Sequence, residues 1–251
     1  MRVDLNCDLG ETVDGVQTAD DAALFPLITS ANIACGFHAG DAETMLSSCL
    51  LAVEHGVSVG AHVSYRDRAH FGRADLEVTP SVLIDEIVEQ LEALAAAAEK
   101  AGTGIRYVKP HGALYNRIAR DDRKADAVAT AIARFSPGLP LMGLSGSRVA
   151  QAAAAHGLPF LREAFVDRAY QRNGSLAPRS WPGAVLHGED EIAERAVAMV
   201  TDGTVRALDG TLLRVEVDSL CVHGDTPDAV AMAGAVRRAL ADAGVDLAAA
   251  V

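Results

Sequence analysis

The fold is decided by residues 79–112, TPSVLIDEIVEQLEALAAAAEKAGTGIRYVKPHG, which place one helix, one strand and one polar segment in succession. Thr79 and Pro80 suit a helix start, because a hydroxyl caps free N–H groups there and proline loses no hydrogen bond. Apolar residues then recur every three or four positions, which is typical of a helix with one buried face. We therefore expect a helix from Thr79 to about Lys100, followed by a buried strand at Ile105–Lys109.

The same alternation of strand and helix runs through the whole chain. Further strands are expected at Arg2–Asn6, Thr29–Ala34, Val57–Ala61, Leu139–Gly143, Pro159–Glu163 and Leu212–Val217, with Ser219–Val222 as an optional last piece. Further helices are expected at Asp41–His55, Asp122–Phe135, Ser147–His156, Glu189–Thr201 and Thr226–Ala243. Strict alternation predicts a parallel sheet with right-handed crossovers, and seven or eight such units in 251 residues favour a closed or nearly closed (β/α) barrel.

The runner-up is a doubly wound open sheet, although no G-x-G-x-x-G motif follows the first strand. No linker, low-complexity tract or internal repeat interrupts residues 1–251. The chain is therefore expected to form a single domain.

Composition excludes several classes of function. The chain is half hydrophobic and carries 34 acidic against 22 basic residues, a net charge of −12, so nucleic acid and anionic membranes are poor partners. No apolar run approaches the length of a membrane helix, and the first residues lack the apolar segment of a signal peptide. Four cysteines without a C-x-x-C pair offer neither a disulfide framework nor a zinc ribbon. A soluble, cytoplasmic protein is expected.

Polar residues cluster directly after the predicted strands, where parallel α/β folds place their active sites. The segments are DLNCDLGE at 4–11, SANIACGFHAGD at 30–41, GAHVSY at 60–65, VKPHGALYN at 108–116, EAFVDRAY at 163–170 and CVHGDTP at 221–227. His38, His62, His111 and His223 occupy equivalent points after four of these strands. That repetition favours a shared site over four separate, merely hydrogen-bonded histidines.

Asp4, Asn6 and Asp8 alternate along the first strand, so their side chains share the face that would line a barrel interior. A buried acid is costly unless it is paired, which favours a functional role for Asp8, whereas Asp4 could equally be a structural partner. Burial of Lys109 would lower its pKa and suit proton transfer or anion binding; a solvated lysine at the barrel mouth is the alternative. Arg168 could clamp a carboxylate together with the preceding Asp167, or form a simple surface pair.

A metal ion is a further alternative, because Asp8, His38 and His62 could supply one carboxylate and two imidazoles. No H-x-x-x-H pair supports it, and no G-x-x-x-x-G-K-[ST] loop is present to hold ATP.

Asp41 and Asp225 lie near helix starts and are expected to be N-caps. The cysteines at 7, 35 and 221 lie in or beside the polar segments and are expected to be small packing residues rather than nucleophiles.

Taken in order, these six segments resemble the LamB/YcsF family. The resemblance implies a distorted, seven-stranded (β/α) barrel related to those of glycoside hydrolases and polysaccharide deacetylases. It also implies ATP-dependent hydrolytic opening of the lactam of 5-oxo-L-proline to L-glutamate. In that activity the chain would act as the A subunit of a 5-oxoprolinase, and separate subunits B and C would share the handling of ATP.

The motifs also imply a set of site residues. Catalytic candidates are Asp8, His38, His62, Lys109, His111 and Glu163, and substrate-binding candidates are Asn6, Asn32, Tyr115, Arg168 and His223. Asp8 would act as general base or orient the water, the histidines at 38 and 62 would polarise the reacting group or supply protons, and Lys109 and Arg168 would hold a carboxylate or phosphate. Two other functions stay open: a metal-dependent deacetylase or amide hydrolase acting alone, and a non-catalytic subunit that presents 5-oxoproline to a partner.

Overall fold

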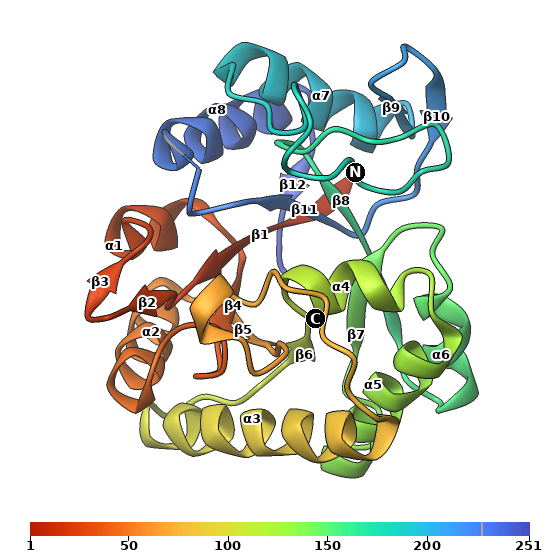
Figure 1. The fold of residues 1–251 in the computed structure, drawn as a ribbon. Helices are drawn as coiled ribbons and strands as arrows, with labels where there is room; N and C mark the ends of the chain where they lie inside the picture. The colour runs from red at the N-terminus through yellow and green to blue at the C-terminus, as the bar shows by residue number, and fades with distance from the viewer. Residues whose placement is uncertain (227) are drawn as a thin grey trace.

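Seven parallel strands form a closed barrel in the computed structural model, which describes residues 1–226 and 228–251. In order around the barrel they are β1 (Arg2–Leu9), β4 (Ser30–Ala34), β5 (Ser58–His62), β6 (Tyr107–Val108), β7 (Leu141–Leu144), β8 (Phe160–Phe165) and β11 (Ser219–Val222). Strand β11 pairs with β1 and closes the ring, and helices surround it (Figure 1). This closure confirms the predicted barrel and excludes the open doubly wound sheet.

Helices cover the outside of the barrel. They are α1 (Asp21–Leu24), α2 (Ala42–His55), α3 (Pro80–Lys100), α4 (Gly112–Ile118), α5 (Asp122–Phe135), α6 (Val149–Ala155), α7 (Glu189–Thr201) and α8 (Ala229–Asp242), with short 3-10 turns η1 (Phe25–Leu27) and η2 (Arg68–His70). The predicted caps are confirmed, since Thr79 accepts the N–H of Val82 and Asp41 accepts the N–H of Thr44. None of the described helices has the length and apolar character needed to cross a bilayer.

The expected strand at Leu212–Val217 is wrong as a barrel strand. Residues Leu212–Arg214 form β10, which pairs antiparallel with β9 (Thr204–Arg206) in a ribbon outside the ring. Both Leu212 and Arg214 are exposed, whereas a barrel strand is covered on both faces. The short piece at Ser219–Val222 is the seventh barrel strand instead.

Some predicted bounds also differ: the strand expected at Ile105–Lys109 is only Tyr107–Val108, and the first strand extends to Leu9. Other differences are small elements that the apolar pattern did not indicate. They are α1, α4, the hairpin of β2 (Thr12–Val13) and β3 (Val16–Gln17), and β12 (Asp246–Leu247), which pairs with the start of β1. The last helix begins at Ala229 rather than at Thr226, and Pro227 within the predicted range lies outside the described residues.

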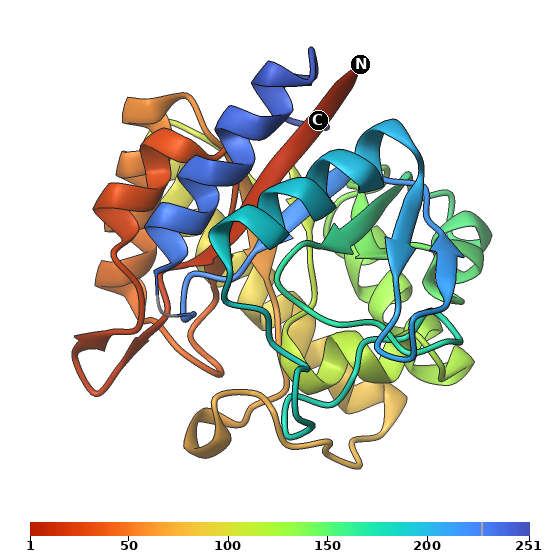
Figure 2. The same cartoon turned by 90° about the horizontal axis from the view of Figure 1, so that it is seen from above.

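The long connections that follow β1, β5 and β8 all lie at one end of the barrel (Figure 2). This end collects the carboxyl ends of the parallel strands and therefore every polar segment that follows them. The prediction that Asp4, Asn6 and Asp8 share one face is also supported, because all three are buried and hydrogen-bonded to polar neighbours on adjacent strands.

Asp4 lies deep in the barrel and serves as a structural partner. Its carboxylate accepts hydrogen bonds from the hydroxyl groups of Thr29, Ser30 and Ser219, and burial raises its pKa. These bonds join β1 to both of its barrel neighbours, β4 and β11. A buried carboxyl group satisfied in this way stabilises the ring without contacting the open end.

Gly60 is required by the close approach of Tyr107 in the barrel interior. A Cβ atom at position 60 would lie 2.2 Å from Cζ of the Tyr107 ring, which is fully buried and donates its hydroxyl to Asn32. We expect Gly60→Ala to lower the free energy of unfolding by about 3 kcal/mol in urea denaturation, because the ring has no space to move into. Gly104→Ala is the matched control, since nothing lies within 4 Å of that site; an unchanged midpoint for Gly60→Ala would contradict the packing.

Candidate active site

A cavity of about 1000 Å³ opens at the carboxyl ends of the barrel strands. Of the residues that the sequence singled out, those lining it are Asp8, His62, Lys109, His111, Tyr115, Arg168 and His223. Arginines gather on its walls, at positions 73, 120, 168, 172, 179 and 214. The cavity is therefore locally cationic although the chain carries a net charge of −12.

The other predicted residues lie beneath the cavity floor. Asn6, Asn32, His38 and Glu163 are each 0% exposed, and each contacts a side chain that lines the cavity. The barrel thus brings all the predicted residues to one end, but these four support the site from below rather than line it.

Lys109 is a buried cation between two carboxylates. Its Nζ lies 2.9 Å from Oδ1 of Asp8 and 2.7 Å from Oε1 of Glu163, and it also donates to Oδ1 of Asn6. Burial opposes its charge, but Asp8, Cys221 and Glu163 hold its pKa well above the usual value. The expected lowering of this pKa is therefore wrong, because the sequence did not reveal the two carboxylates that flank the amine.

Asp8 is held as an ionised acceptor on the floor of the cavity. Its Oδ1 accepts hydrogen bonds from Asn32 and Lys109, and its Oδ2 lies 3.3 Å from Nε2 of His62. Although burial opposes the charge, His62 and Lys109 hold the pKa of Asp8 well below its usual range. A carboxylate this acidic is a poor acceptor of a full proton and is better suited to orienting a water molecule.

Three histidines pack against one another beside Asp8. The rings of His38 and His111 stack with centroids 3.9 Å apart, and His62 meets both rings edge-on. Burial lowers the pKa of His38 and of His111 well below the usual value, so both imidazoles are neutral. Gly72 makes room for the stack, because a Cβ there would lie 2.7 Å from the His111 ring, and its φ of +66° favours glycine.

Glu11 is a site residue that the sequence-based selection missed. Its Oε1 lies 3.1 Å from Nε2 of His38 and 3.4 Å from Nδ1 of His111, and burial together with Asp8 raises its pKa to about 8. In the sequence, Glu11 could have been identified from its position as the last residue of the polar segment DLNCDLGE. In the structure, the preceding Gly10 has a φ of +68°, which turns the chain back toward the barrel mouth. Together with the three histidines, Glu11 forms a cluster of side chains able to bind a metal ion.

The proposed pairing of Asp167 with Arg168 is not what the structure shows. Asp167 accepts hydrogen bonds from the backbone N–H and Nδ1 of His223, and so fixes that ring beside the cavity. Arg168 instead donates to the carbonyl groups of Ala177 and Ala184, which orders the loop between them. Burial lowers the pKa of Arg168 to about 10, so the guanidinium remains charged at neutral pH.

Asp225 was expected to cap the last helix, and this expectation is wrong. Its carboxylate instead pairs with Arg73 and lies 3.8 Å from Arg179, so it joins two of the loops that wall the cavity.

The cysteines at 7, 35 and 221 are buried and free, and burial raises the pKa of each thiol, which fits packing rather than nucleophilic chemistry.

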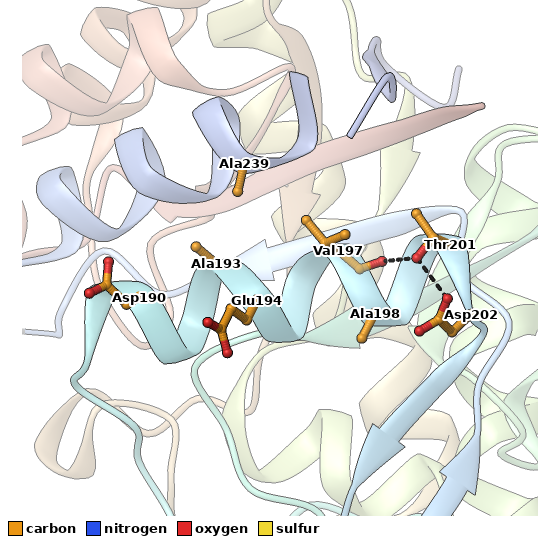
Figure 3. A pocket seen from close by; sticks show the side chains of 8 residues that line it. All are labelled: Asp190, Ala193, Glu194, Val197, Ala198, Thr201, Asp202 and Ala239. Atoms are coloured by element: carbon orange, nitrogen blue, oxygen red, sulfur yellow. Dashed lines mark hydrogen bonds between the residues drawn. The ribbon is translucent and has the colours of Figure 1, made fainter. Parts of the chain in front are cut away.

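A second hollow, of about 490 Å³, lies between α7 and α8 on the outside of the barrel (Figure 3). Asp190, Glu194 and Asp202 point into or beside it, and Thr201 donates back to the carbonyl of Val197 in its own helix. None of the predicted site residues lines this hollow. The barrel mouth is therefore the place where the described part of the chain concentrates groups able to do chemistry.

A parallel barrel that gathers carboxylates, imidazoles and a buried lysine at the carboxyl ends of its strands is the architecture of a barrel enzyme. The chain belongs to the LamB/YcsF family, whose sequence model matches residues 3–251. It is 51% identical to the A subunit of the 5-oxoprolinase of Paracidovorax citrulli over 98% of each chain.

Solved structures agree with this family. The lactam utilization protein of Thermus thermophilus superposes with a TM-score of 0.93 at 44% identity, over 99% of this chain and all of the other. A T48 deacetylase superposes with a TM-score of 0.50 at 15% identity, over 98% and 86% of the two chains, which shows likeness of fold alone. The deacetylase-like barrel implied by the motifs is confirmed.

Proposed function

We propose that this chain is the ring-opening component of a 5-oxoprolinase, the enzyme that hydrolyses the lactam of 5-oxo-L-proline to L-glutamate with consumption of ATP. The proposal rests on family membership and on relatives near 50% identity that carry this name over almost their whole length. The structural observation that carries it is the placement of Asp8, Lys109 and the paired imidazoles of His62 and His111 on the floor of one cationic cavity.

The reaction needs three events that this floor can assist. Water adds to the lactam carbon, the C–N bond of the ring breaks, and the ring nitrogen takes up a proton. Because a lactam is resonance-stabilised, transfer of the terminal phosphoryl group of ATP to its oxygen, with release of ADP, would give a better electrophile for the water. Once the C–N bond has broken, a second water would release inorganic phosphate from the resulting acyl phosphate and leave L-glutamate. We assign the nucleotide to companion subunits, B and C, since this chain has no phosphate-binding loop motif. A cytoplasmic location, where ATP is available, belongs to the same proposal.

The geometry suggests a role for each group. The ionised Asp8 orients the attacking water beside the imidazoles of His62 and His111, which line the same part of the cavity. Lys109 stabilises the charge that develops on the lactam oxygen, while Glu163 fixes the lysine from below.

The substrate-binding candidates divide by depth in the barrel. Tyr115, Arg168 and His223 line the cavity and are proposed to contact the substrate. Asn6 and Asn32 lie beneath it and are proposed to position Asp8 and Lys109.

The test is a glutamate-release assay with 5-oxo-L-proline and ATP, run on the chain with and without companion subunits B and C. We expect release only in the complete mixture. Release by this chain alone without ATP would favour an independent amide hydrolase, and substrate binding without any turnover in the complete mixture would favour a presenting subunit.

Arg179 is expected to hold the carboxylate of the substrate. It lines the cavity, and its ion pair with Asp225 is long, at 3.8 Å, so its guanidinium can turn to an anionic ligand. We expect Arg179→Gln to raise KM about 10- to 100-fold with a smaller change in kcat, because a charge-assisted bond made in the ground state is lost. Arg123→Gln, on an exposed position of α5 away from the cavity, is the matched control; equal KM values for the two variants would remove Arg179 from binding.

A further inference from the structure

We infer that Glu11, His38, His62 and His111 bind one transition-metal ion at the inner wall of the cavity. One atom from each of these four buried side chains lies within 4.8 Å of the others. The geometry of this cluster supports the ligand set and the kind of ion independently of the ring-opening proposal.

The ring nitrogens that point away from the cluster are already engaged in hydrogen bonds. Nδ1 of His38 lies 2.9 Å from Oγ of Ser64, whose hydroxyl is directed at the carbonyl of Tyr65 and so accepts from the ring. Nδ1 of His62 donates to the carbonyl of Lys109, and Nε2 of His111 donates to the carbonyl of Phe71. In a neutral imidazole only one nitrogen carries a proton.

The three inner nitrogens, Nε2 of His38, Nε2 of His62 and Nδ1 of His111, therefore face one another and Glu11 and are the nitrogens left to bind an ion. Nε2 of His62 and Nδ1 of His111 are only 2.9 Å apart. Histidines that ligate metals show this arrangement, with the outer N–H given to a carbonyl or another acceptor and the inner lone pair directed at the ion.

The spacing of the four ligand atoms also suits a metal ion. A tetrahedral ion with bonds of about 2.0–2.2 Å places neighbouring ligand atoms roughly 3.4 Å apart. Oε1 of Glu11 lies 3.1 Å from Nε2 of His38 and 3.4 Å from Nδ1 of His111, and the His62–His111 separation is slightly shorter. Small outward shifts of the rings would therefore accommodate an ion without moving the strands.

Three nitrogens and one oxygen favour zinc, cobalt or nickel over magnesium and calcium, which take oxygen ligands. A second group of potential ligands, Asp8, Cys221 and His223, is less suitable. The ammonium of Lys109 lies 2.9 Å from Asp8 and 3.2 Å from Sγ of Cys221, so a cation already occupies that side of the floor. Asp8 thus stands beside the proposed site, with its Oδ2 3.3 Å from Nε2 of His62, rather than within the ligand set.

The test measures metal binding on the full chain without substrate. The purified protein is stripped with a chelator and titrated with Co²⁺, whose visible absorption reports the geometry and number of nitrogen and oxygen ligands. We expect saturation at one equivalent, and displacement of Co²⁺ by Zn²⁺. Glu11→Gln and His38→Gln should each weaken binding about 100-fold or more, because each removes one ligand. Cys221→Ala should bind as the unchanged protein does.

Two outcomes would overturn the assignment. Absence of saturable binding by the folded protein would mean that shared protons alone hold the cluster together. Binding retained in Glu11→Gln but lost in Cys221→Ala would assign the ion to the second group. Circular dichroism confirms that each variant is folded, and if His38→Gln does not fold, the nearly isosteric Glu11→Gln carries the test. A protein that binds one ion yet releases no glutamate in the complete mixture would count against the ring-opening proposal alone.

Discussion

Replacement of Asp8 by asparagine is expected to lower kcat for glutamate release about 1000-fold in the assembly with its companion subunits. The asparagine Oδ1 can still accept hydrogen bonds from Asn32 and Lys109, so the floor of the barrel should keep its shape. The substitution removes the negative charge of Asp8 and the hydrogen-bond acceptor at its Oδ2 atom. The measurement is steady-state kinetics at saturating 5-oxo-L-proline and ATP.

Asp4→Asn is the matched control, because Asp4 lies on the same face of β1 but is satisfied by hydroxyl groups below the cavity. Its kcat should stay within about threefold of the unchanged protein, whatever happens to its stability. If Asp8→Asn turned over at a near-normal rate, Asp8 would have no role in orienting water. If both variants lost activity equally, the effect would come from the strand and not from the site.

The sequence was sufficient to predict which residues meet at the barrel mouth, and the reason is topological. In a parallel barrel the residues that follow each strand arrive at the same end, whatever their separation along the chain. His38, His62 and His111 therefore converge although they follow three different strands. Strand periodicity likewise placed Asp4 and Asp8 on one interior face.

The sequence was not sufficient where the outcome depends on backbone turns or on neighbouring charges. Glu11 reaches the histidines only because Gly10 adopts a left-handed conformation, which the surrounding residues do not dictate. The pKa of Lys109 rises rather than falls because Asp8 and Glu163 flank it, and these three groups come from three different strands. Likewise, Leu212–Val217 has the composition of a buried strand, and only tertiary packing leaves it outside the ring.

Because two carboxylates flank Lys109, we also expect a large effect when this residue is replaced. Lys109→Met should lower the free energy of unfolding by about 3–5 kcal/mol, because it leaves the buried carboxylates of Asp8 and Glu163 without their common cation. Urea denaturation of the full chain at neutral pH measures the loss. The same variant should release no glutamate, since the cation proposed to stabilise the lactam oxygen is gone.

These two effects of Lys109→Met can be separated by a second substitution. Adding Glu163→Gln removes one of the two carboxylates, so the double variant should regain at least half of the lost stability while remaining inactive. Glu163 is fully buried and does not line the cavity, which makes it a suitable partner for this cycle. If the double variant were as unstable as Lys109→Met, repulsion between the carboxylates would not be the cause of the loss. If it regained activity, Lys109 would serve only to balance the buried charge, and another group would have to stabilise the lactam oxygen.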